Sequence, residues 1–183
     1  DIEDFALIKK VQAGDTDAFD VLVRKYYGAV YQFCYRRLNG DADTAADITQ
    51  EVFLKLLENI QAVRMLGKFQ NYLITIAVNI CNNYFKKAKP IYTDLDALEL
   101  TDDTDSSFDR IIQDENRLEV RRAINALPDY QKEVIILRFY HELKIREIAK
   151  ITKASVPTVK SRLQQGLKKL QRYLTDFKGG ESI

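Results

Sequence analysis

A short break between two helical patterns constrains the last third of the chain most strongly. Residues 144–151 form a short amphipathic segment, and from Ser155 onward apolar residues recur at spacings of three and four as far as Leu174. Only the tripeptide at 152–154, TKA, separates the two segments. Two helices joined by so short a turn are typical of a helix-turn-helix.

The longer of these two helices has two chemically different faces. Its predicted buried face holds Val156, Val159, Leu163, Leu167, Leu170 and Leu174. The opposite face carries Pro157, Lys160, Ser161, Gln164 and Lys168. That face offers hydrogen-bond donors and acceptors of the kind that a major groove reads, so one hypothesis is a reader of double-stranded DNA. The alternative is a solvated basic helix in a helical bundle.

The start of this helix also fits DNA recognition. Ser155 is a good N-cap, and Pro157 falls in the first turn, where a missing N–H costs little. In helix-turn-helix proteins this end of the second helix meets base edges, so Lys160 is a candidate donor to guanine and Gln164 a candidate partner of adenine. The predicted phosphate contacts, which position the protein without specifying sequence, are Arg138, Lys144, Arg146, Lys153 and Arg162.

Helical periodicity also dominates the rest of the chain, so we predict an all-α fold. The expected helices cover about 4–13, 15–38, 42–60, 68–87, 108–127 and 129–140. We predict two small helical domains, at residues 1–90 and 108–178. Between them, residues 91–107 are acidic and poor in periodicity, and this composition predicts a linker.

The net charge of +1 hides a strong asymmetry along the chain. Residues 94–119 hold ten acidic and two basic side chains, whereas residues 120–183 hold 14 basic and six acidic ones. Residues 1–93 are nearly balanced, with 12 basic and 11 acidic side chains. Such blocks indicate separate partners for different parts of the chain.

Several classes of site are not supported by the residues present. Cys34 and Cys81 have no CxxC partner, and we expect two buried, reduced thiols. His141 is the only histidine, so we expect no histidine-based metal site. No Ser-His-Asp arrangement, phosphate-binding Gly-rich loop or zinc motif appears, so we expect no cofactor and no enzymatic activity. No stretch approaches the roughly 20 apolar residues of a membrane span, and no signal peptide is visible, so we expect a cytoplasmic protein.

The helix expected around residues 45–57 is a second candidate surface. Ile48, Val52 and Leu56 suit the core. Off that stripe lie three polar side chains and a second apolar edge, namely Asp47, Gln50, Glu51, Phe53 and Leu57. A helix too apolar for one buried face often docks a partner, although tight packing on two sides explains the pattern equally well.

The helix expected over 68–87 is the third candidate. Its predicted buried stripe is Phe69, Tyr72, Leu73, Ile76, Ala77, Ile80 and Tyr84. The opposite face is rich in amides and holds Asn71, Thr75, Val78, Asn79, Asn82 and Lys86. Amides, cations and nearby aromatic rings suit unstacked bases and a phosphate backbone. The alternative is an ordinary polar face in contact with solvent.

Three stretches carry a resemblance to a known family: AFDVLVRKYYGAVYQFCYRRLNGDADTAADITQEVFLKLL (18–57), GKFQNYLITIAVNICNNYFKK (67–87) and LPDYQKEVIILRFYHELKIREIAKITKASVPTVKSRLQQGLKKL (127–170). Together they resemble bacterial sigma factors, specifically the small extracytoplasmic-function group of the sigma-70 family. The first two are similar to sigma region 2 and the third to region 4. The likeness covers nearly the whole chain.

The resemblance implies roles for the three surfaces. The residues matching the helix that binds the polymerase clamp are Asp47, Gln50, Glu51, Phe53 and Leu57. Those matching the segment that opens and holds the −10 element are Phe69, Asn71, Tyr72, Thr75, Asn79, Asn82, Asn83 and Lys86. The −35 reader would use Ser155, Pro157, Thr158, Lys160, Ser161, Arg162, Gln164 and Lys168.

Two departures from the family pattern stand out. The family often has Trp-Leu where this chain has Tyr72-Leu73, and tyrosine can still stack on a base. The turn of the family's helix-turn-helix usually carries glycine near Lys153, so the sequence TKA predicts a non-glycine residue at positive φ.

The resemblance implies a non-enzymatic sigma factor that directs core RNA polymerase to −10/−35 promoters and assists DNA melting. The implied partners are core RNA polymerase, promoter DNA and an anti-sigma factor, with no small-molecule substrate and no membrane insertion. One alternative is a one-component helix-turn-helix regulator whose N-terminal domain senses a signal or dimerises. Another is a protein-interaction module with an incidental basic helix.

Overall fold

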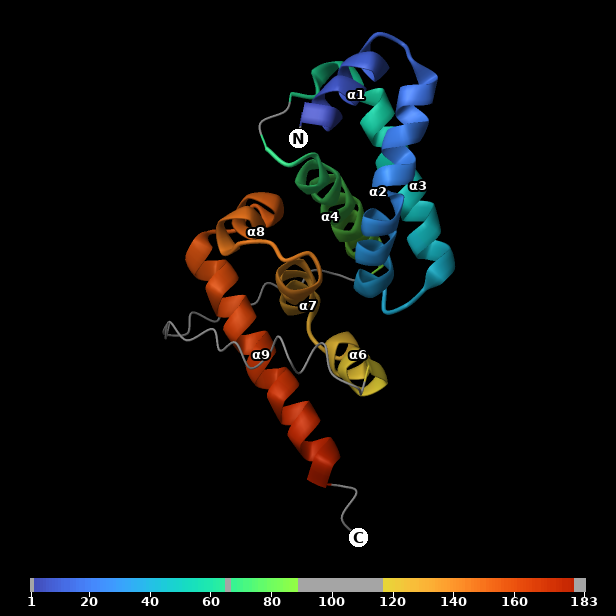
Figure 1. Cartoon of the computed structure of the whole chain (residues 1–183). Helices are drawn as coiled ribbons and strands as arrows, with labels where there is room; N and C mark the ends of the chain where they lie inside the picture. Colours follow the sequence, from blue (N-terminus) through green and yellow to red (C-terminus); the bar gives the residue numbers. More distant parts are fainter. Residues whose placement is uncertain (1, 65–66, 89–116, 180–183) are drawn as a thin grey trace. The chain divides into compact units, whose positions relative to one another are not determined.

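The structure is a computed structural model, and it describes residues 2–64, 67–88 and 117–179. These residues form helices and short turns with no strand among them, which confirms the all-α prediction. The chain divides into two compact units, Asp1–Tyr92 and Thr93–Ile183, and each is described by itself (Figure 1). The predicted acidic linker at 91–107 and the start of the helix expected at 108 lie outside the described residues, so the proposed domain boundaries stay predictions.

The described part of the first unit contains four α-helices and one 3-10 turn. They are α1 (Ile2–Gln12), α2 (Thr16–Arg37), α3 (Ala42–Glu58), η1 (Ile60–Ala62) and α4 (Phe69–Ala88). Aspartates begin two of them: the Asp15 carboxylate accepts from the Ala18 N–H at 3.0 Å, and the Asp41 carboxylate accepts from the Thr44 N–H at 3.1 Å. Such caps satisfy N–H groups that a helix start leaves without an internal partner, and they fix where each helix begins.

The core of this unit lies where α2, α3 and α4 pack against one another (Figure 1). Its fully buried apolar side chains include Leu22, Val30, Phe33, Val52, Leu56, Leu73 and Ala77. Phe19 and Val23 of α2 are half-buried at the edge of this core.

The stripe predicted for α4 is only partly correct. Tyr72 and Tyr84 are exposed rather than buried, with exposed fractions of 37% and 42%. Ile74 and Val78 are buried instead. The reason is that α4 contacts both α2 and α3, so its buried surface is wider than one stripe and is rotated from the prediction.

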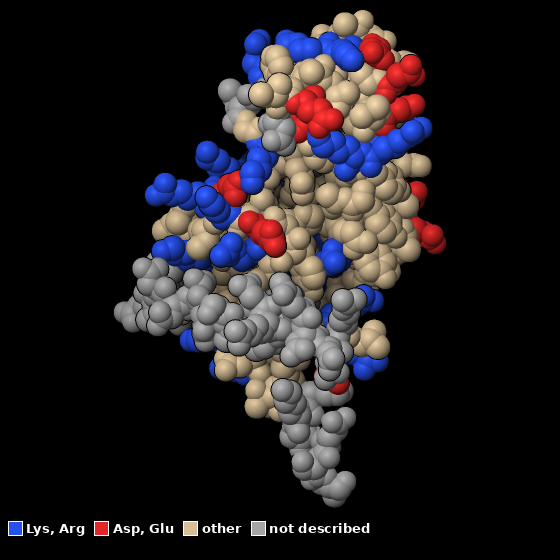
Figure 2. Space-filling model, in the orientation of Figure 1, with Lys and Arg blue, Asp and Glu red and all other residues tan. Residues whose placement is uncertain are grey.

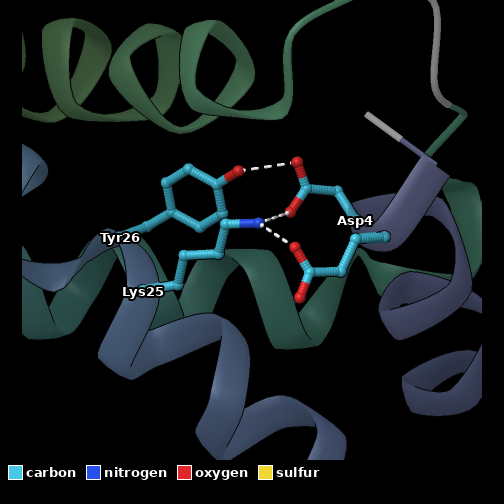
Figure 3. Close-up of polar contacts among 4 residues, drawn as sticks. Asp4, Lys25 and Tyr26 are labelled. Atoms are coloured by element: carbon cyan, nitrogen blue, oxygen red, sulfur yellow. Dashed lines mark hydrogen bonds and ion pairs between the residues drawn. The ribbon is translucent and has the colours of Figure 1, made fainter.

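Helix α1 is held to α2 by a buried carboxylate. The Tyr26 hydroxyl donates to Asp4 Oδ2 at 2.7 Å, and Lys25 Nζ donates to Asp4 Oδ1 at 2.9 Å and to Glu3 Oε2 at 3.0 Å (Figure 3). The Tyr26 ring also meets the Phe69 ring edge-on, with centroids 5.3 Å apart. This cluster therefore links α1, α2 and the start of α4.

The two cysteines, distant in sequence, meet inside this unit. Cys34 and Cys81 are both buried thiols, as predicted, on α2 and α4. A hydrogen bond with the Cys81 thiol, and a weaker contribution from Thr49, lower the pKa of Cys34 even though burial opposes this shift.

The described part of the second unit contains α6 (Arg117–Asn125), α7 (Asp129–Ile135), the π-helical turn η2 (Ile136–Tyr140), α8 (Ile145–Thr152) and α9 (Val156–Gly179). The helix expected over 129–140 is thus an α-helix that ends in a π-helical turn. Helix α9 packs against α6, α7 and α8. The two helices α7 and α9 lie close together at Gly166, where an added Cβ would lie 2.7 Å from Ile135 Cδ1.

Two general features of the described residues bear on function. No helix among them is long and apolar enough to cross a membrane. Within the same part of the chain, no group of three or more His, Cys, Asp or Glu side chains is placed to hold a metal ion.

Candidate functional surfaces

The turn between α8 and α9 has the geometry of a helix-turn-helix. Lys153 ends α8 at φ 54°, which confirms the prediction of a non-glycine residue at positive φ. The Ala154 N–H donates to the Ala149 carbonyl at 3.1 Å across this residue. The Ser155 hydroxyl then accepts from the Thr158 N–H at 3.2 Å, so the predicted N-cap is confirmed and α9 starts at a fixed angle.

Helix α9 buries the face predicted from its sequence. Val159, Leu163, Leu167 and Leu170 are buried, whereas Val156 and Leu174 are half-buried. On the other side, Ser155, Pro157 and Lys168 are exposed. The remaining predicted contacts are half-buried, namely Thr158, Lys160, Ser161, Arg162 and Gln164. The structure therefore brings this predicted set together along one helix.

A basic surface surrounds the turn. Lys and Arg side chains gather around α8 on the face shown in Figure 2. The exposed members near the turn are Lys144, Arg146, Lys150 and Lys153. Arg138, a predicted phosphate contact, is engaged differently, because its Nη1 donates to the Leu143 carbonyl at 3.1 Å and so braces the loop before α8.

Two contacts from α7 to α9 were not predicted from the sequence. Gln131 Nε2 donates to Gln165 Oε1 at 3.1 Å, and Gln165 Nε2 donates to Ser161 Oγ at 3.4 Å. The Arg162 guanidinium lies over the Tyr130 ring, with Cζ 5.6 Å from the centroid. Tyr130 and Gln131 are adjacent in sequence, but no local pattern indicates which residues of a later helix they meet.

The outer face of α3 carries polar and apolar side chains together. Asp47, Gln50 and Glu51 are exposed, as predicted, and Leu57 is 44% exposed. Phe53 is only 5% exposed and stacks on Tyr27 of α2 with ring centroids 6.2 Å apart, so it belongs to the packing between helices.

Leu54 is the member of the α3 face that the sequence reasoning missed. It is 59% exposed and follows Gln50 by four positions, which places it on the same face of the helix. That spacing was a usable signal. The prediction instead took the neighbouring aromatic residue, Phe53, as the apolar edge.

Only part of the polar face predicted for α4 is exposed to solvent. Asn79, Asn83 and Lys86 are exposed, and Tyr72 projects beside them while stacking on Phe69 at 6.1 Å between centroids. Phe69 itself is buried. The half-buried members of the predicted set are Asn71, Thr75 and Asn82. Burial raises the pKa of Tyr72 above its usual range.

A buried arginine ties the last turns of α4 to α2. Arg37 is 2% exposed, its Nη2 donates to Asn82 Oδ1 at 3.3 Å, and its guanidinium lies 4.6 Å from the centroid of the Phe85 ring. The Asn82 carbonyl oxygen therefore has an intramolecular role. The exposed aromatic group at this end of the helix is Tyr84.

Comparison with known proteins gives a family for each unit. Residues 22–91 match Sigma-70 region 2, and residues 117–170 match Sigma-70, region 4. The chain is 34% identical over 181 residues to the ECF RNA polymerase sigma factor SigW of Bacillus subtilis, an alignment that covers 93% of this chain and 96% of the relative. It is 31% identical to the ECF RNA polymerase sigma-E factor of Escherichia coli, over 88% of this chain and 89% of the relative.

A solved structure shares the fold. The sigma factor RpoE of Bartonella quintana, in complex with the anti-sigma factor NepR, has a TM-score of 0.66 at 20% identity, over 86% of this chain and 96% of that chain. Region 2 falls in the first unit of this chain and region 4 in the second. The chain therefore belongs to the sigma-70 family, and within it to the extracytoplasmic-function (ECF) RNA polymerase sigma factors.

Proposed function

We propose that this chain binds core RNA polymerase and directs it to promoters with −10 and −35 elements, assisting DNA melting at initiation. The observation that carries the proposal is the presence of both sigma regions in one chain, with a relative 34% identical along nearly its entire length. A one-component regulator would account for the helix-turn-helix but would leave the exposed α3 face without a use.

The α3 face is the proposed docking site for the polymerase. Leu54 and Leu57 lie in contact with solvent beside Gln50 and the carboxylates of Asp47 and Glu51. A mixed face of this kind suits a protein interface, in which apolar anchors supply affinity and a charged rim supplies orientation. Phe53 contributes indirectly, because its stacking on Tyr27 holds α3 against α2.

The exposed side of α4 is the proposed contact with the −10 element. Tyr72 offers a ring on which an unstacked base can stack, while Asn79, Asn83 and Lys86 offer amide and cationic groups to the strand. Asn71, Thr75 and Asn82 line the same helix and complete the proposed set. Phe69 is buried and holds the Tyr72 ring by stacking on it, so it does not contact DNA itself in this proposal.

Helix α9 is the proposed reader of the −35 element. Its N-terminal half presents Pro157, Thr158, Lys160, Ser161 and Gln164 for base edges. Exposed cations around α8, together with Arg162 and Lys168, supply phosphate contacts that position the helix without specifying sequence.

In this proposal the polymerase performs the chemistry and the chain is not an enzyme. The protein acts in the cytoplasm, where core polymerase and promoter DNA are found. An anti-sigma factor is a further proposed partner, because the structurally similar RpoE is in complex with one.

Capture of core RNA polymerase tests the proposal. We expect the wild-type chain to retain bacterial core polymerase, and we expect the variant Gln50→Ala/Leu54→Ala/Leu57→Ala to retain at least about tenfold less, because clustered interface anchors carry most of the binding energy. Phe53→Ala is a poor probe, because it would remove a packed ring from between α2 and α3.

The matched control is Val21→Ala, which trims an apolar side chain that is 46% exposed on a different helix, α2. It should bind polymerase as the wild type does. Equal capture by the triple variant and the wild type would refute the site, and no capture by the wild type would refute the function. Run-off transcription by the assembled holoenzyme on a genomic library then identifies the promoters.

A further inference from the structure

The first turn of α7 holds two side chains of α9 through separate contacts. Gln131 is bonded through its amide to Gln165, and Gln165 is bonded in turn to Ser161. The Tyr130 ring lies under the Arg162 guanidinium. Two consecutive residues of α7 thus each engage a different part of α9.

Gln131 lies in an unusual place for an amide. It is 1% exposed, and its Oε1 is buried with no hydrogen bond among the described residues. Burying a polar group without full hydrogen bonding costs stability, and an apolar side chain of similar size would avoid that cost. The side-chain amide of Gln131 donates to Gln165, so the structural effect of this side chain is to orient Gln165.

The close packing of α9 against α7 fixes the position of Gln165 relative to Gln131. At Gly166 a Cβ would lie 3.5 Å from Gln131 Cβ and 2.7 Å from Ile135 Cδ1, so α9 lies directly against α7 at this point. Ser161 precedes Gln165 by four residues and therefore lies one turn toward the start of α9. The constraint therefore passes one turn along the same face of α9, from Gln165 to Ser161.

We propose that Tyr130 and Gln131 are positioning residues for DNA recognition by α9, although neither belongs to the set of proposed DNA contacts. The proposal rests on the function proposed above. Gln131 acts on Ser161, which faces bases, and so it affects which −35 sequences are preferred. Tyr130 acts on Arg162, a phosphate contact, and so it affects affinity for all −35 sequences alike.

Transcription from a promoter library separates these two effects. The full chain is assembled with bacterial core polymerase on a promoter that the wild type uses, with its −35 element randomised, and the transcripts are sequenced. Gln131→Leu and Gln165→Leu should each change the relative use of −35 sequences about threefold to tenfold, the effect of one lost hydrogen bond. Both variants should change the preference at the same base positions. The double variant should differ little from either single variant, because Gln131 and Gln165 belong to one series of hydrogen bonds that ends at Ser161.

Tyr130→Leu should lower transcription about twofold to fivefold on every −35 sequence, the effect of one lost cation–π contact. Tyr130→Phe keeps the ring and should behave as the wild type does. Preserved transcription by Tyr130→Leu, or an equal loss in Tyr130→Phe, would overturn the assignment of the ring.

Ile136→Val is the control for a purely structural effect. Ile136 is also fully buried in this unit, and the variant should lose stability without changing −35 preference. The inference is overturned when Gln131→Leu and Gln165→Leu both keep the wild-type preference, or when Ile136→Val gives the same change. Thermal unfolding identifies a variant that does not fold. If Gln131→Leu does not fold, the variant at the half-buried Gln165 tests the same hydrogen bond from the α9 side.

A wild-type chain that transcribes no member of the library refutes the proposed function itself, and the inference falls with it.

Discussion

Gly166 and Gly28 are both glycines in the middle of long helices, and their surroundings predict opposite responses to an added methyl group. At Gly166 a Cβ would meet Ile135 Cδ1 at 2.7 Å inside a packed core, whereas at Gly28 nothing lies within 4 Å. Alanine at a helix interior normally stabilises by up to about 1 kcal/mol relative to glycine. Overpacking of a core costs about 1–3 kcal/mol, so crowding should outweigh propensity at Gly166.

We therefore expect Gly166→Ala to lower the free energy of unfolding by about 1 kcal/mol. Ile135→Val removes the atom in the way, so the double variant Gly166→Ala/Ile135→Val should be more stable than the sum of the single effects predicts. Urea denaturation of the four proteins measures this coupling. Gly28→Ala serves as the control and should be neutral or stabilising. Strict additivity in the cycle would contradict the crowding account.

Lys153 carries backbone strain at the turn of the helix-turn-helix. Its φ of 54° costs a side chain with a Cβ roughly 1–2 kcal/mol, a cost that glycine avoids. Lys153→Gly should therefore raise the free energy of unfolding by about 0.5–1 kcal/mol, because the relief exceeds the added entropy of the unfolded chain. Lys153→Ala removes the charge but keeps the Cβ, so it should give no such gain. Equal stabilities of the two variants, measured by thermal unfolding, would show that conformation is not the cause.

The attachment of α1 depends on pH through the cluster in Figure 3. Burial, and then the hydrogen bond to Asp4, raise the pKa of Tyr26 to about 12. A tyrosine in the unfolded chain has a pKa of about 10. The neutral Tyr26 hydroxyl therefore stabilises the first unit fully below about pH 10, and this stabilisation is lost as the pH rises through about 12. The contribution of Asp4 to stability depends on pH in the opposite direction. Although burial opposes it, hydrogen bonds from Lys25 and Tyr26 lower its pKa, so its contribution is lost as the pH falls through that lowered value.

Difference titration of tyrosine absorbance at 295 nm tests this cluster. The wild type minus Tyr26→Phe should show one phenol with a midpoint near 12. In an Asp4→Asn background, where the accepting carboxylate is gone, the same difference should move toward about 10. A wild-type midpoint already near 10 would mean that Tyr26 is not hydrogen-bonded to Asp4 in solution.

Whole helices were predicted from sequence better than the faces they bury. The cap at Ser155 is a local hydrogen bond, so the residues themselves indicate where α9 begins. The stripe of α9 was largely correct for a similar reason, since its apolar residues keep one helical spacing. Helix α4 packs against two neighbours, and its sequence does not show how the resulting wide surface divides between them.

The distribution of charge along the whole molecule predicts weak DNA binding by the free chain. The net charge is only +1, and the acidic block at 94–119 offsets the basic block that follows it. Salt-dependent affinity for DNA grows with the number of phosphates that cations neutralise, so a nearly neutral chain gains little from this effect. Two separate units must also be brought into register before both promoter elements are bound, which costs affinity.

We expect the isolated full-length chain to show little promoter-specific binding in a mobility-shift assay, and the same chain to bind the same DNA once core polymerase is added. A nonspecific duplex of equal length provides the control for electrostatic attraction. Tight, sequence-specific binding by the free chain would contradict this expectation and would favour a one-component regulator.

The sequence by itself determined the helical class, the order of the two sigma regions, the cap at Ser155, the helix-turn-helix and its strained turn. These features depend on residues within a few positions of one another, or on motifs long enough to mark a family. The tertiary structure alone decided that Phe53 is buried between α2 and α3, that Cys34 meets Cys81, and that Gln131 donates to Gln165. Each of these depends on how one helix is rotated against another, and that rotation follows from the packing of the whole core rather than from any local pattern.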